Sequence, residues 1–323
     1  MMDGAPSGSG RSGGRASDGA SPLGIGACCA ALGGLPRGIF RPTPPDREFL
    51  AGLHDAGLPP ARTVVNLRAL PQVSRSVPTP FIAEGVMAPH SVGSAMTAFV
   101  VEHPEATFVV DPGICTHVRQ RAVAEVPLAL RLVVKPPAHV LDLCTSLEQI
   151  GIRPAQLDFA LPTHLHWDHV AGLLDLLELP MRIHATELDW AMTGDLAPVG
   201  GVRNAVRGRP IDEYELDGPP VLTFARSHDL FDDGSVTLVD LPGHTPGSVG
   251  VLLHTARGPV LLAGDAAWHS LQVEHIRQKA SFPGNLVDED RAETFRTLHR
   301  LHAIRGAVRV VPTHDPDAAR FPF

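Results

Sequence analysis

Cysteine, lysine and long apolar runs are scarce in this sequence of 323 residues. The four cysteines are too few and too scattered for a disulfide framework, and no CxxC spacing indicates a thiolate metal site. The longest apolar stretch, residues 23–35, is interrupted by glycines and is shorter than the roughly 18 residues that span a bilayer. These absences predict a protein of the reducing cytoplasm with no membrane partner.

Basic residues are too few and too dispersed to follow a phosphate backbone. The chain has 27 Lys+Arg against 35 Asp+Glu, a formal net charge of -8, and no basic stripe. Nucleic acid is therefore not expected as a partner. Lys135 and Lys279 are the only lysines, and this bias towards arginine carries no functional meaning in the sequence alone.

The beginning of the chain has the composition of an unstructured segment. Glycine and serine dominate residues 1–38, which therefore cannot bury enough apolar surface to offset the entropy of ordering. We expect a disordered tail over 1–38 and one folded domain over 39–323. The alternative is an exported lipoprotein, because two arginines precede a sequence that loosely resembles a lipoprotein cleavage box ending at Cys28.

Short β-branched and aromatic runs alternate with helical patterns along the rest of the chain. A hairpin is predicted over 98–110, a buried strand over 157–161, and an irregular segment over 195–220. Further predicted elements are strands over 236–240, 248–253, 260–263 and 308–311 and a helix over 288–302. Sheet-forming runs in both halves predict an α/β fold with two sheets rather than one doubly wound sheet.

Four side chains that can bind metal directly follow the strand predicted over 157–161. The segment reads Thr163-His164-Leu165-His166-Trp167-Asp168-His169. A locally extended backbone points His164 and His166 to one side, while Asp168 and His169 start the next turn towards a neighbouring position. This spacing suits two adjacent metal ions better than it suits ordinary buried histidines.

Three more candidates stand alone, each at the end of an apolar run. His244 lies in a turn rich in glycine and proline, Asp265 ends the strand over 260–263, and His314 follows the last strand. Loops at strand ends often carry function on a rigid scaffold. The five histidines and two aspartates offer only nitrogen and oxygen, which favours two zinc ions and leaves iron, manganese or cobalt as alternatives.

In this order of ligands, the sequence resembles the metallo-β-lactamase superfamily, from about Ala98 to Asp315. The resemblance implies a four-layered αβ/βα sandwich with the metals at one edge between the sheets. The ligand sets that it implies are His164, His166 and His244 for the first metal, Asp168, His169 and His314 for the second, and Asp265 as the bridge. It also implies that Asp111 supports the metal loop, although an aspartate that only begins a Pro-Gly turn is an equal alternative.

A pair of metal ions favours hydrolysis. Two ions about 3.5 to 4 Å apart can bridge one water and lower its pKa from ~15.7 towards ~7, which supplies a metal-bridging hydroxide at neutral pH. The hydroxide would attack the substrate, while Asp168 or a bound water passes a proton to the leaving group. Lactones, esters, thioesters, β-lactams and phosphoesters all suit such a centre, so this chemistry leaves the bond open.

Within the superfamily, the N-acyl homoserine lactonases are the closer resemblance, through residues 164–169, Asp265 and the final His314. This implies a small-molecule lactone or a related carboxylic ester as the substrate. The alternatives are a glyoxalase II-like thioesterase, another di-zinc hydrolase that acts on phosphoesters or β-lactams, and a metal-binding module with little turnover.

The sequence departs from those lactonases at Trp268, where they commonly carry a tyrosine that donates a hydrogen bond to the lactone carbonyl. The indole N–H of Trp268 could donate in the same way, which makes Trp268 a second catalytic candidate beside Asp168. Packing of the pocket wall is the alternative role for this side chain. Tyr214 and His269 are weaker candidates for contacting substrate, and the oligomeric state stays open.

Overall fold

The computed structural model describes residues 25–126, 131, 136–137, 140–194 and 202–320. Its first sheet has six strands, which follow one another in space in their sequence order. They are β1 (Asn66–Pro78), β2 (Ser91–His103), β3 (Ala106–Val110), β4 (Phe159–Leu161), β5 (Met181–His184) and β6 (Ile211–Tyr214). β1 to β3 pair antiparallel and β3 to β6 pair parallel, so the carboxyl ends of β3, β4 and β5 lie at one edge.

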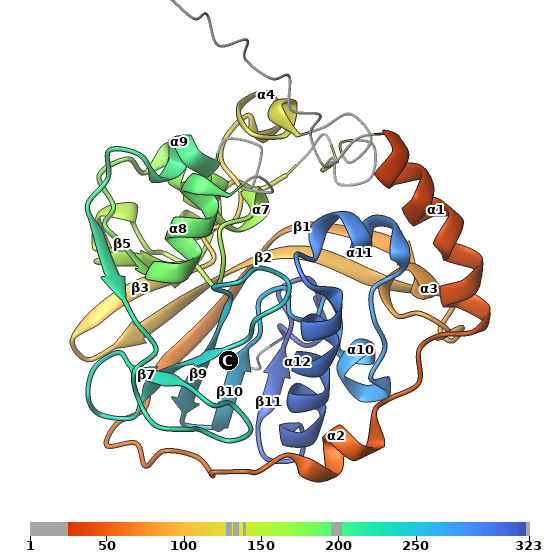
Figure 1. Cartoon of the computed structure of the whole chain (residues 1–323). Helices are drawn as coiled ribbons and strands as arrows, with labels where there is room; N and C mark the ends of the chain where they lie inside the picture. Colours follow the sequence, from red (N-terminus) through yellow and green to blue (C-terminus); the bar gives the residue numbers. More distant parts are fainter. Residues whose placement is uncertain (1–24, 127–130, 132–135, 138–139, 195–201, 321–323) are drawn as a thin grey trace, which may run out of the picture.

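The second sheet has five strands in the order β11-β10-β9-β8-β7. They are β7 (Ser227–Asp229), β8 (Val236–Asp240), β9 (Val249–Thr255), β10 (Gly258–Leu262) and β11 (Arg309–Val311). All neighbours pair antiparallel except β10 and β11, which are parallel. Figure 1 shows β9 to β11 together with α12 on one side of the molecule, and β5 together with α8 on the other.

Alternate residues of the central strands belong to different apolar layers. Phe99 of β2 and Val251 of β9 pack in the cluster between the sheets. Their chain neighbours point outwards, Val100 into the layer under the helices of the first sheet and Leu252 into the layer under the helices of the second. Because both faces of each sheet are buried, the order of layers is helix, sheet, sheet, helix. This confirms the predicted four-layered αβ/βα sandwich.

Short helices cover the outer faces of the sheets and the site edge. They are α1 (Ile25–Phe40), α2 (Arg47–Gly52), α3 (Thr79–Ile82), α4 (Val118–Arg121), α6 (Leu143–Gln149), α7 (Trp167–Val170), α8 (Ala185–Thr193), α9 (Val202–Val206), α10 (Ser270–His275), α11 (Ser281–Val287) and α12 (Arg291–Ile304). The carboxylate of Asp290 caps α12 by accepting the N–H of Glu293 at 2.9 Å. Leu298 and Leu301 then bury the inner face of α12 against the second sheet, in agreement with the helix predicted over 288–302.

The structure corrects the predicted boundary of the tail. Residues 25–38, which we expected to be disordered, lie in α1, and α1 packs along α11. Small side chains allow this close approach, since the Ser281 hydroxyl donates to the carbonyl of Ala31 at 2.7 Å and a Cβ at Gly34 would lie 2.8 Å from the Ser281 Oγ. The apolar and small residues of α1 therefore form a packed helix, whereas residues 1–24 lie outside the described part of the chain.

The segment expected to be irregular over 195–220 is partly regular. Residues 195–201 lie outside the described residues, but α9 and the edge strand β6 follow them. The strand was not predicted because three of its four residues, Ile211, Asp212 and Glu213, are exposed, which leaves almost no buried apolar pattern. Within the described ranges, no helix is long and apolar enough to span a membrane.

Candidate metal centre

The parallel strands of the first sheet explain where the contiguous predicted ligands lie. β4 ends at Leu161, and His164 and His166 follow it in the loop at the site edge. The loop turns into α7 at Trp167, so Asp168 and His169 lie in the first turn of that helix. The change from extended to helical backbone separates the two pairs of side chains, as the sequence predicted.

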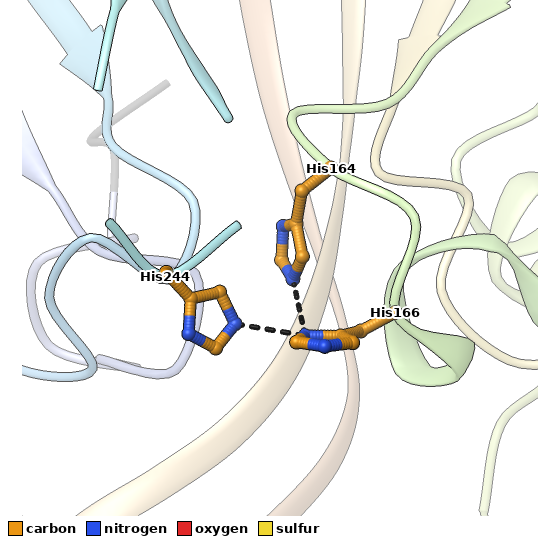
Figure 2. A group of neighbouring side chains, drawn as sticks. All are labelled: His164, His166 and His244. Atoms are coloured by element: carbon orange, nitrogen blue, oxygen red, sulfur yellow. Dashed lines mark hydrogen bonds between the residues drawn. The ribbon is translucent and has the colours of Figure 1, made fainter. Parts of the chain in front are cut away.

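Three imidazoles from both sheets converge at one point (Figure 2). The Nε2 of His164 lies 3.0 Å from the Nδ1 of His166, and that Nδ1 lies 2.8 Å from the Nε2 of His244. His164 and His244 are each 1% exposed. Because His244 comes from the loop after β8, this set forms only when the two sheets pack together.

A second set lies beside the first. Asp168, His169 and His314 offer ligand atoms that all lie within 4.8 Å of one another. Asp265 stands between the sets: its Oδ1 is 3.3 Å from the Nε2 of His169 and 3.1 Å from the Nε2 of His314. Its Oδ2 is 3.4 Å from the Nε2 of His244. The structure therefore brings all seven predicted ligands together, with Asp265 facing both sets.

Hydrogen bonds on the far ring nitrogen orient four of the five histidines. The Nδ1 partners are Thr163 Oγ1 at 3.1 Å for His164, Asp111 Oδ2 at 2.8 Å for His169, Asp288 Oδ1 at 2.8 Å for His244 and the carbonyl of Ala95 at 2.5 Å for His314. Donation from Nδ1–H to these oxygens leaves the Nε2 lone pair directed at the centre. His166 differs, since it presents Nδ1 to the centre.

Asp111 anchors the loop that carries the contiguous ligands. It directly follows β3 and has a positive φ of 48°, a conformation that aspartate tolerates better than most residues. The carboxylate accepts the N–H of Thr163 at 2.7 Å and its hydroxyl at 3.0 Å, in addition to the bond from His169. The expectation that Asp111 supports the metal loop is confirmed.

Charges in the centre favour neutral imidazoles in one set and a charged cluster in the other. Burial lowers the pKa of His164 and His166 well below the usual range, so both rings are neutral and able to bind metal. Burial would also lower the pKa of His169, but the charges of Asp111 and Asp265 outweigh it and raise that pKa. In turn, His314 and His169 hold the pKa of Asp265 well below its usual range, against the effect of burial.

The buried polar atoms fit a pair of metal ions. The Nε2 of His169 and the Oδ1 of Asp265 have no hydrogen-bond partner among the described residues, although both are buried. Such atoms are costly unless something else binds them. Nitrogen and carboxylate oxygen are the donors that zinc accepts, and each set supplies three ligands with Asp265 between them.

Lys279 and Asp288 are residues of the site that sequence reasoning missed. The Nζ of Lys279 donates to the carbonyl of Asp265 at 2.8 Å and to the Oδ1 of Asp288 at 2.6 Å, and the side chain is 1% exposed. Burial alone would raise the pKa of Asp288, but the charge of Lys279 and the bond from His244 lower it to about 2. One signal was present, because a chain that otherwise uses arginine places one of its two lysines here.

The structure places Trp268 against the carboxylate of Asp265, which faces both ligand sets. Its Nε1–H donates to the Oδ2 of Asp265 at 2.7 Å, and the Nζ of Lys279 lies 4.9 Å from the centroid of its ring.

Tyr214 and His269, the other two candidates for contacting substrate, have different surroundings. Tyr214 is buried and stacks between His184 and His228, with ring centroids 5.9 and 5.2 Å away.

His269 has a local structural role. Its Nδ1 accepts the N–H of Leu271 at 3.2 Å and thereby caps α10, and the same nitrogen lies 3.4 Å from Asp315. These contacts occupy the Nδ1 of His269 without any substrate.

Comparison with known proteins agrees with this geometry. The sequence profile of the metallo-β-lactamase superfamily matches residues 94–314, which is more than half of the chain. The chain belongs to the metallo-β-lactamase superfamily. This confirms the resemblance seen in the sequence and places the protein among the metal-dependent hydrolases of that superfamily.

Lactonases are prominent among the similar sequences and structures. The chain is 26% identical over 237 residues to the N-acyl homoserine lactonase AttM of Azorhizobium caulinodans, covering 68% of this chain and 81% of AttM. It is 29% identical over 190 residues to a probable metallo-hydrolase of Mycobacterium tuberculosis, covering 53% of this chain and 59% of the relative. An N-acyl homoserine lactone hydrolase, solved with the product N-hexanoyl-L-homoserine at its catalytic metal centre, superposes with a TM-score of 0.59 at 16% identity, over 79% of this chain and 95% of that one. At this identity the structural likeness shows the fold alone.

Proposed function

We propose that the protein is a di-zinc hydrolase that opens a small lactone or cleaves a related carboxylic ester in the cytoplasm. The observation that carries the proposal is the convergence of five histidines and two aspartates into two adjacent ligand sets joined by Asp265. The similarity to the lactonase AttM supports the choice of bond. His166 and Asp168 are the two ligands that stay partly exposed, so we expect substrate to reach the centre on their side.

The residues of the chain divide the work of hydrolysis among them. When bound, two zinc ions lower the pKa of water and polarise the substrate carbonyl, which makes hydroxide available for attack at neutral pH. Asp265 fixes the spacing of the two ligand sets through its two oxygens. The side chain of Asp168 is 15% exposed and lies 3.6 Å from the Nε2 of His314, where its carboxylate can carry a proton to the departing alkoxide.

A substrate panel on metal-replete protein tests this function. Purified protein is analysed for metal content, and kcat/KM is measured for an N-acyl homoserine lactone, a linear ester, a thioester, a β-lactam and a phosphoester. We expect two metal ions per chain and the highest kcat/KM on the lactone or the linear ester. If kcat/KM for the thioester or phosphoester is about 10-fold or more above that for the lactone and the linear ester, the proposed substrate class is wrong. Active protein without transition metal would reject the proposal.

A further inference from the structure

The first ligand set depends on two loops that come from different sheets. His164 and His166 lie in the loop after β4, whereas His244 lies in the loop after β8. A ligand set divided in this way keeps its spacing only if something other than the metal fixes one loop against the other. The corner between β5 and α8 touches both loops and contains no metal ligand.

Glu187, in the first turn of α8, holds both loops through one carboxylate. Its Oε1 accepts the N–H of Leu165 at 2.8 Å, and its Oε2 accepts the N–H of Gly247 at 3.2 Å. The hydroxyl of Thr245 also hydrogen-bonds to it. The side chain is fully buried, which raises its pKa to about 7 although these hydrogen bonds oppose the rise. Leu165 lies between two metal ligands, and Thr245 follows His244 directly.

His184 also hydrogen-bonds to the loop of His244. Its Nδ1–H donates to the carbonyl of Gly247 at 3.0 Å, so the corner satisfies both backbone groups of that glycine. The loop also approaches α8 too closely for a side chain, because a Cβ at Gly247 would lie 2.2 Å from the backbone nitrogen of Glu187. A glycine is therefore required where the loop of His244 meets the corner.

We propose that Glu187 is a positioning residue that clamps the loop of His164 and His166 to the loop of His244 and so sets the affinity of the first metal site. This inference rests on the proposed di-metal function. Hydrogen bonds that both loops donate to one carboxylate hold the three imidazoles at a fixed spacing before metal binds. Outer partners of metal sites typically change metal affinity by about 10- to 100-fold when they are lost.

The substitution Glu187→Gln tests the clamp with little change of volume. The glutamine NH₂ would face either the N–H of Leu165 or the N–H of Gly247, so one loop loses its acceptor. We expect one of the two zinc-binding steps to weaken about 10-fold, measured by competition with a chelator against metal-free full-length protein. Thermal unfolding of the same metal-free samples reports the accompanying loss of stability.

Asp233→Asn is a matched control. Asp233 also links the two halves, because its carboxylate contacts His103, the last residue of β2, at 3.2 Å and accepts the N–H of Ser235 before β8 at 2.8 Å. Those contacts lie at the end of the strands away from the ligands, since β3 and β8 lead from there to Asp111 and to the loop of His244. Asp233→Asn should lower stability without changing zinc affinity.

The outcomes separate failure of the Glu187 clamp from failure of the proposed function. Weaker zinc binding in Glu187→Gln, with unchanged binding in Asp233→Asn, supports the clamp. Equal zinc affinity of Glu187→Gln and the parent overturns it, whereas a parent chain that binds no zinc rejects the proposed function instead. If Glu187→Gln does not fold, His184→Phe removes the donor to Gly247 but keeps the aromatic ring, and it should weaken zinc binding in the same step by about 3-fold; an unchanged affinity there also overturns the clamp.

Discussion

The two halves of the sandwich supply the proposed metal ligands in different ways. The first half places four ligands in one loop and helix start, and Asp111 alone binds both the beginning and the end of that segment through Thr163 and His169. The second half places His244, Asp265 and His314 at three separate strand ends. A contiguous set is built by local backbone geometry, whereas separate ligands depend on the packing of the whole second half.

Each separate ligand accordingly has at least one hydrogen-bond partner that is 14 or more residues away in the sequence. His244 is held by Asp288, and Asp265 receives bonds from Trp268 and, through its carbonyl, from Lys279. His314 donates across the sandwich to the carbonyl of Ala95. The ligands of the second half thus each depend on a separate partner, whereas Asp111 serves two residues of the first half, and substitutions can test this difference.

The largest loss of activity and metal binding is expected on substitution of Asp265, which faces both ligand sets. Asp265→Ala removes the only carboxylate that faces both ligand sets within the described centre, so both ions should bind more weakly and kcat/KM should fall about 1,000-fold or more. His166→Ala removes a ligand from the first set alone, and one ion should remain bound. Elemental analysis and kcat/KM on the preferred substrate measure both effects, with circular dichroism as a check of folding.

A control for Asp265→Ala is available at the same edge of the second sheet. Asp240 ends β8 but pairs with Arg226 at 3.6 Å instead of facing the ligands. Asp240→Ala should keep two ions and full activity. Retention of two tightly bound ions by Asp265→Ala would show that the halves do not share a bridging residue.

A large effect on stability is expected at Lys279. Lys279→Met leaves the buried carboxylate of Asp288 without its cation, and breaking such a buried pair typically costs about 3 to 5 kcal/mol. His244 still donates to Asp288, so we expect about 3 kcal/mol or less in the free energy of unfolding, measured with urea on metal-free protein.

The double variant Lys279→Met with Asp288→Asn sharpens this experiment. It removes the charge as well as its partner, and should recover part of the lost stability because no unpaired charge remains buried. A single variant that is as stable as the parent would show that the second half does not depend on this ion pair.

The difference between the halves also explains what the sequence could predict. Residues 164–169 were identified with their geometry because the strand end and the start of the helix are local features. His244, Asp265 and His314 were found through their order and the resemblance. Lys279, Asp288 and Glu187 were missed because single buried charges have no periodic pattern, and their partners are defined only by tertiary packing.

The boundary of the folded part was misjudged for a related reason. Small residues such as Ala31 and Gly34 give almost no hydrophobic pattern in the sequence. They nevertheless let α1 approach α11 closely. Helix packing against a specific partner therefore outweighed a composition that resembles a disordered tail.

The smallest effect is expected at Trp268, where two roles predict different patterns of loss. An indole has one N–H, so Trp268 cannot donate to Asp265 and to a substrate carbonyl at the same time. The structure directs that N–H to Asp265 at 2.7 Å, and we therefore expect Trp268→Phe to lower kcat/KM by about 10-fold or less on every substrate, with weaker metal binding. If Trp268 instead donates to the substrate carbonyl, as predicted from the sequence, Trp268→Phe should lower kcat/KM only for lactones and esters, at constant metal content. Trp268→Ala also removes the ring that lies beside Lys279. It should therefore lower kcat/KM more than Trp268→Phe does, on all substrates, if the ring supports the second half of the site. Equal and unchanged rates in both variants would mean that Asp265 keeps its position without help from this side chain.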